Sequence, residues 1–93
     1  MRYIDVLWHS NSDEEPYRLV SEIGTDNFET RKIEFFKHGE IGYASKVSNK
    51  GKTMLGVIEV PSLEELNTCD EFDGKNISAS DFEKLWRTHV NLK

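Results

Sequence analysis

Short segments that alternate between apolar and polar side chains fill the first 60 residues, and polar turns separate them. In residues 3–9, Ile4, Val6 and Trp8 share one face, a period-two pattern typical of a half-buried strand. Comparable segments follow at residues 17–23, 28–36, 41–46 and 54–60. Because short turns join antiparallel neighbours, we expect an antiparallel β-meander of about five strands.

The turns and the second strand carry more specific expectations. Gly39 follows His38 in a turn and supplies the positive φ that a tight hairpin needs. The polar run of residues 48–52 is expected to be a loop. In the second strand, Tyr17, Leu19 and Ile23 are expected on a common side.

Two helix starts are readable in the last third of the chain. Ser62 and Glu65 have the spacing of a capping box, which predicts a short helix from about Leu63. Ser78 and Asp81 have the same spacing and predict a second helix. Its apolar stripe, which should pack on one face of the sheet, consists of Phe82, Leu85, Trp86 and Val90. The expected fold class is therefore α+β.

Length and composition bound the architecture and the compartment. A chain of 93 residues makes a single domain, residues 1–93. The one cysteine, Cys69, has no partner for an internal disulfide, so a reducing compartment fits. Asp5 and His9 interrupt the N-terminal apolar run, and no stretch is long enough to span a bilayer. We expect a cytoplasmic protein with no membrane partner.

The net charge of −5 is unevenly distributed along the chain. Residues 59–73 contain no base and six acids, Glu59, Glu64, Glu65, Asp70, Glu71 and Asp73. A nucleic-acid binder needs a basic footprint, so direct binding of RNA or DNA is disfavoured. The segment is either a solvated face that keeps the chain soluble or a binding surface for a basic protein. A second acidic candidate is Asp13, Glu14 and Glu15.

The sequence offers few candidates for a catalytic or metal-binding site. Asp5, His9 and Glu22 on neighbouring strands would be the residues of a small enzyme or ligand-binding domain, although Asp5 and His9 are about 13 Å apart along one strand. Nucleotide-binding loops and nucleophile motifs are missing from the sequence. Acids beside Cys69 disfavour a thiolate there.

A faint calcium-loop pattern in residues 70–74 lacks the spacing and the closing Glu of an EF-hand. We therefore expect no metal, no cofactor and no enzymatic activity.

Several sequence blocks together resemble a small bacterial domain family that covers nearly the whole chain. These blocks are residues 1–8 (MRYIDVLW), 16–22 (PYRLVSE), 31–34 (RKIE), 39–44, 77–78, 82–83 and 85–86. Within that family the chain is similar to immunity proteins of contact-dependent growth inhibition systems. In particular, it is similar to an immunity protein that is paired with a toxin of the RNase A-like superfamily.

This resemblance implies a cytoplasmic antidote that binds the toxin domain and blocks its RNA-cleaving cleft. It supplies no catalytic motif to transfer, so the candidate partner-facing residues remain the acids of residues 59–73 and 13–15. We expect a monomer that forms a 1:1 complex with its cognate toxin. Carboxylates would occupy phosphate positions in the basic cleft of the nuclease.

Overall fold

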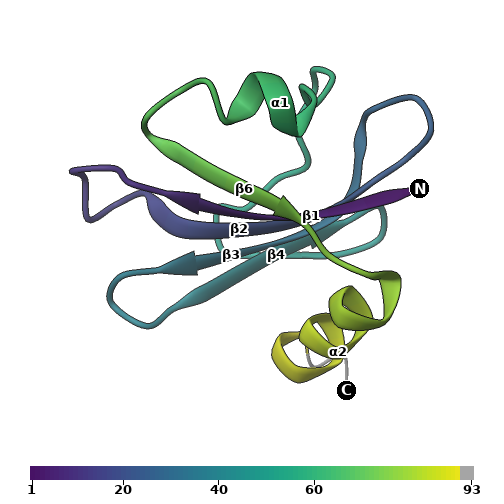
Figure 1. Ribbon diagram of the computed structural model, residues 1–93. Helices are drawn as coiled ribbons and strands as arrows, with labels where there is room; N and C mark the ends of the chain where they lie inside the picture. The colour runs from purple at the N-terminus through teal and green to yellow at the C-terminus, as the bar shows by residue number, and fades with distance from the viewer. Residues whose placement is uncertain (91–93) are drawn as a thin grey trace.

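The alternating segments form consecutive antiparallel strands in the computed structural model, which describes residues 1–90. Within those residues the chain has one six-stranded sheet and two helices (Figure 1). The elements are β1 (Arg2–Trp8), β2 (Pro16–Ile23), β3 (Glu29–Phe36), β4 (Ile41–Ser45), β5 (Asn49–Lys50), α1 (Leu63–Leu66), β6 (Phe72–Asn76) and α2 (Ala79–His89). The α+β class, with an antiparallel sheet and two helices, is confirmed.

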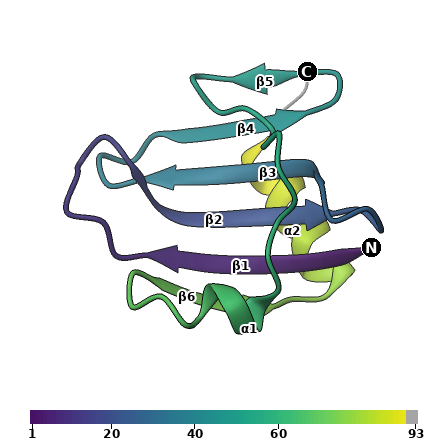
Figure 2. The ribbon, with the colours of Figure 1, turned by 90° about the horizontal axis from the view of Figure 1, so that it is seen from above.

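The order of the strands across the sheet is β5-β4-β3-β2-β1-β6. The first five strands are therefore a meander, and the chain then returns across the sheet to place β6 on the far side of β1. This return passes over the strands in Figure 2, where the segment between β5 and α1 runs across the sheet. The sheet has β6 at one edge and the two-residue β5 at the other.

Two sequence predictions about strands are wrong. Residues 54–60 were predicted to be a strand but form irregular backbone. Two of their amides donate to a side chain and to a turn carbonyl, and not to a neighbouring strand. The Gly56 amide donates to Glu29 Oε1 (2.7 Å) and the Val60 amide donates to the Asn27 carbonyl (2.7 Å). The predicted loop contains β5 instead. Strand β6 was missed because Phe72-Asp-Gly-Lys-Asn76 has one apolar side chain and shows no alternation.

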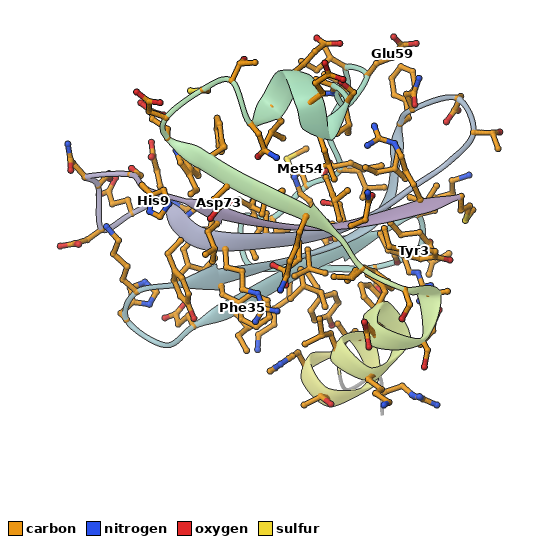
Figure 3. The ribbon with its side chains drawn as sticks, in the orientation of Figure 1. Tyr3, His9, Phe35, Met54, Glu59 and Asp73 are labelled. Carbon is orange, nitrogen blue, oxygen red and sulfur yellow. The ribbon has the colours of Figure 1, made fainter. Side chains whose placement is uncertain are left out.

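The face of the sheet under α2 holds the larger hydrophobic cluster. The predicted stripe of α2 is confirmed there, since Phe82, Trp86 and Val90 are buried against Val20, Ile33 and Phe35, with Leu85 partly buried beside them. Tyr3 of β1 packs on Phe82, with ring centroids 5.3 Å apart. Figure 3 shows Tyr3 and Phe35 on this side of the sheet.

The opposite face carries α1 and a second cluster. Ile4, Val6 and Ile23 are buried in it, and Leu63 and Leu66 of α1 pack against them. Gly74 of β6 leaves room for this packing, because a Cβ there would lie 2.8 Å from a methyl carbon of Leu63, which would have to shift. The short helix therefore rests directly on the backbone of β6.

The expected common side for Tyr17, Leu19 and Ile23 is also wrong for Tyr17. Register shifts between Pro16 and Arg18, and again between Glu22 and Ile23, mark irregularities in the pairing of β2 with β3. The first shift turns Tyr17 toward Phe35, with ring centroids 6.5 Å apart on the α2 side, whereas Ile23 lies in the α1-side cluster. A bulge of this kind breaks strict alternation.

The helix starts and the turn glycine follow the sequence predictions. Ser62 Oγ accepts a hydrogen bond from the Glu65 amide (3.2 Å), and Ser78 Oγ accepts one from the Asp81 amide (3.0 Å). Each bond satisfies a donor that the first helical turn leaves free. Gly39 has φ +94°, as the turn requires. Among residues 1–90, neither helix has the length and apolar character needed to cross a membrane.

Candidate functional site

The segment of residues 51–62, here called the crossing segment, runs over the α1-side face of the sheet (Figure 2). Polar anchors hold it in place. Besides the Gly56 and Val60 amide bonds, Thr53 Oγ1 donates to Glu34 Oε1 at 2.7 Å. Thr53 is fully buried, and Gly42 of β4 has no Cβ to collide with it. The crossing segment thus has a defined path although it is not a strand.

Charged side chains lie beneath the crossing segment where a second apolar layer would otherwise pack. Lys32 Nζ lies 3.3 Å from Glu29 Oε1 and 3.9 Å from Glu34 Oε2, and all three side chains are largely buried. Ser21 Oγ donates to Glu29 Oε2 (3.2 Å). Because the sheet presents paired charges here, apolar side chains of the segment gain little by facing inward.

Three apolar side chains of the crossing segment consequently face solvent, whereas Leu55 and Val60 are half-buried. Met54 is 69% exposed, Val57 86% and Ile58 75%. We call these three residues the apolar triplet. Figure 3 shows Met54 on the same side of the sheet as Glu59 and α1. A neighbouring group of exposed apolar side chains is typical of a surface that binds another protein.

Acidic side chains lie next to the apolar triplet. Glu59 follows Ile58 directly, and Glu64 and Glu65 are exposed on α1. We call Glu59, Glu64 and Glu65 the α1 acidic patch. Glu59 and Glu65 line one surface hollow of about 620 Å³. Arg2 lies at the rim of the hollow, where its guanidinium donates to the Val60 and Pro61 carbonyls (3.0 and 3.2 Å).

The remaining acids of residues 59–73 lie elsewhere. Asp70 and Glu71 precede β6 at the end of the sheet where β1 stops, since Trp8 pairs with Phe72. Trp8 Nε1 donates to a Glu71 carboxylate oxygen (3.3 Å). Asp73 projects toward the opposite face, where it lines a hollow with Asp5 and Arg18. Strand β6, which the sequence did not reveal, divides the acidic segment between three surfaces.

The second predicted acidic group lies at the same end of the sheet as Asp70 and Glu71. Asp13, Glu14 and Glu15 belong to the β1–β2 loop, and that loop begins at His9, whose amide donates to the Glu71 carbonyl (2.7 Å). Glu15 accepts a hydrogen bond from Ser10 Oγ, and Asp13 lies 4.0 Å from Lys37 Nζ. Two segments distant in sequence therefore form one acidic end.

The alternative enzyme or ligand site is not assembled by the described residues. Asp5 receives two hydrogen bonds from Arg18 (2.9 and 2.7 Å), and Glu22 receives two from Arg31 (2.9 and 2.7 Å) beneath α2. His9 is exposed where β1 ends. Each carboxylate already has an arginine partner, and Asp5 and His9 line different surface hollows.

Arg31 changes the ionisation of the two carboxylates that it contacts. The hydrogen bonds from Arg31 lower the pKa of Glu22 against the opposing effect of burial, and Thr30 adds a further bond (2.7 Å). Arg31 also lowers the pKa of Glu83 on α2. Its own pKa is raised, first by Glu22 and then by Glu83. These are groups held in their charged forms, which is the state of a structural ion pair rather than of a proton-transfer site.

The other reactive residue types occupy structural positions. His38 stacks on Phe36 in the β3–β4 turn, and His89 ends α2 with its ring edge-on to Phe35 at 5.0 Å. Cys69 is free and exposed. Residues 1–90 contain no group of three or more His, Cys, Asp or Glu side chains placed to hold a metal ion.

Sequence reasoning missed the apolar triplet, because Met54, Val57 and Ile58 were read as part of a strand. The available signal was the adjacent Gly56, which interrupts that pattern. Comparison with curated proteins and with solved structures gives no match for the chain. The model of the family described as "Domain of unknown function (DUF6881)" matches residues 2–91, so the chain belongs to that family.

Proposed function

We propose that this chain is a protein-binding module that acts as a cytoplasmic immunity protein, neutralising a nuclease toxin through its α1-side surface. The observation that carries the proposal is the apolar triplet, fixed outward by the polar anchors of the crossing segment and bordered by the α1 acidic patch. Protein interfaces combine an apolar centre that excludes water with a charged rim that sets specificity.

The acidic rim selects a basic partner. Glu59, Glu64 and Glu65 are exposed and have no ion-pair partner among residues 1–90. Their negative field therefore acts on an approaching molecule, and opposite charge on that molecule raises the association rate. A nuclease has the required basic cleft because it attracts RNA phosphates.

The resemblance of the chain to immunity proteins of contact-dependent growth inhibition systems supports an RNase A-like toxin as the partner. In the complex, the apolar triplet packs beside the cleft, and carboxylates of the α1 acidic patch accept charge-assisted hydrogen bonds from toxin Lys, Arg or His. Occupation of the phosphate positions blocks RNA binding without any chemical step. The expected complex is 1:1.

The test uses the proposed partner, a toxin domain of the RNase A-like superfamily. Association and dissociation rates are measured at several salt concentrations, and RNA cleavage is measured with and without the protein. Replacing Glu59, Glu64 and Glu65 together by lysine is expected to slow association at low salt by about tenfold or more. A matched control makes the same charge change at the acidic end, by replacing Asp13, Glu14 and Asp70.

The control variant is expected to bind at a rate much nearer to that of the unaltered protein, because its substitutions lie at the other end of β1. If the control slows association more than the α1 variant does, the partner binds the acidic end instead. Absence of binding, or binding that does not respond to salt, contradicts the proposed mechanism.

A further inference from the structure

The free edge of β6 is covered at its centre by one side chain. Asn67, which caps the C-terminus of α1, places its carboxamide against Gly74. The Gly74 amide donates to Asn67 Oδ1 at 2.7 Å, and Asn67 Nδ2 donates to the Gly74 carbonyl at 3.0 Å. The carboxamide therefore satisfies the same donor and acceptor that a neighbouring strand would use.

The position of Gly74 in β6 explains why its amide and carbonyl are free to bond to Asn67. It lies opposite Val6 of β1, and its amide and carbonyl point away from β1 toward the edge of the sheet. An exposed edge is a template on which another strand can add, and proteins cover such edges with side chains or loops. Figure 2 shows β6 as the outermost strand on this side, with α1 over it.

The sequence of β6 also indicates which strand could pair with the covered edge. In an antiparallel pairing of two copies centred on Gly74, Asp73 of each copy lies opposite Lys75 of the other. The pairing thus forms two Asp73–Lys75 ion pairs related by a two-fold axis, which is the symmetry of a self-complementary dimer interface. Opposite charges at directly opposed positions stabilise a strand pair, and like charges destabilise it.

The charges needed for this pairing are free in the monomer. Asp73 and Lys75 are both exposed, and neither has an ion-pair partner among residues 1–90. Asp5, which lies beside Lys75 across the β1–β6 pair, is already bound by Arg18. We propose that the β6 edge is a self-association surface for a second copy of this chain. Asn67 keeps it closed together with the turn after α1, in which the Phe72 amide donates to the Cys69 carbonyl (3.1 Å).

The test compares the solution mass of Asn67 variants by sedimentation velocity at high micromolar concentration. The unaltered protein sediments as a monomer. Asn67→Ala frees the amide and carbonyl of Gly74 and produces a dimer that dissociates on dilution. Asn67→Ser is measured in parallel, because its side chain is too short to reach both groups of Gly74 yet it suits the end of α1.

Charge variants identify the interface. Adding Lys75→Glu to Asn67→Ala opposes two carboxylates across the proposed pairing, so the dimer is lost. Adding Asp73→Lys to that double variant restores opposite charges and restores the dimer. The proposal is overturned if the folded Asn67 variants remain monomeric or if the dimer ignores the Lys75 change. It is also overturned if neither variant folds, as shown by circular dichroism, since Asn67 would then be essential to the domain itself.

Discussion

Replacing Arg31 by methionine removes the charge that joins α2 to the sheet while keeping most of the apolar length of the side chain. The guanidinium of Arg31 makes two hydrogen bonds to Glu22 (2.9 and 2.7 Å) and also pairs with Glu83 of α2. It lies 4.8 Å from the ring centre of Phe82 and 5.0 Å from that of Trp86. Glu22 stays buried in the variant without its main partner.

The expected loss follows from these contacts. A buried carboxylate left without its charged donor costs about 1–3 kcal/mol. Two partly exposed cation–π contacts contribute about 1–2 kcal/mol together. The pair with Glu83 adds little, because that side chain is 43% exposed. We expect Arg31→Met to lower the free energy of unfolding by about 3 kcal/mol. Arg31→Lys, which keeps the charge, should lower it by about 1–2 kcal/mol.

The assay is urea denaturation at several pH values. Arg31 lowers the pKa of Glu22 below its ordinary value of 4.5, so this pair contributes stability above pH 4.5. The contribution is lost as the pH falls through the lower pKa of the folded state. In Arg31→Met, protonation instead relieves the unpaired burial of Glu22. The difference in stability between the two proteins should therefore be largest near pH 7 and shrink toward pH 3.

Two results would refute this reasoning. A loss below about 1 kcal/mol for Arg31→Met at pH 7 would mean that the ion pair hardly exceeds the cost of removing its charges from water. A difference in stability that stays constant between pH 7 and pH 3 would mean that Glu22 is not the carboxylate through which Arg31 acts.

Three further substitutions test individual contacts of the fold. Gly42→Ala adds a Cβ 2.0 Å from Thr53 Oγ1, and we expect a loss of about 2 kcal/mol in urea denaturation. Ser78→Ala removes the N-cap bond of α2 and should cost about 1 kcal/mol by the same measurement. Glu29→Ala removes the acceptor of the Gly56 amide, so that amide should exchange with deuterium faster than in the unaltered protein; an unchanged rate would disprove the anchoring role.

The strands and helices that could be predicted are those whose own side chains carry the pattern. Residues 2–8 alternate because β1 buries Ile4 and Val6 on one face. The two cap serines mark the helix starts through bonds within the first helical turn, which do not depend on the sheet. Strand β6 could not be predicted in the same way. Its stability comes from pairing with β1 and from the α1 leucines above Gly74, which are tertiary contacts that its five residues do not encode.

The surface was harder to predict than the fold for a related reason. Counting acids along residues 59–73 suggested one surface, but a strand turns Asp73 to the face opposite α1 and places Asp70 at the end of the sheet. The exposure of Val57 and Ile58 depends on the charges beneath the crossing segment, and those charges come from β3. The exposure of these side chains therefore depends on contacts between segments that are distant in the sequence.

The central claim is that the α1-side surface binds a protein partner. Deuterium exchange of the chain, measured alone and in complex with the proposed toxin domain, tests this claim most directly. We predict that binding slows exchange in the crossing segment and α1, residues 51–66, and leaves the amides of α2 unchanged. Slowed exchange confined to α2 or to the β1–β2 loop, with residues 51–66 unaffected, would contradict the claim.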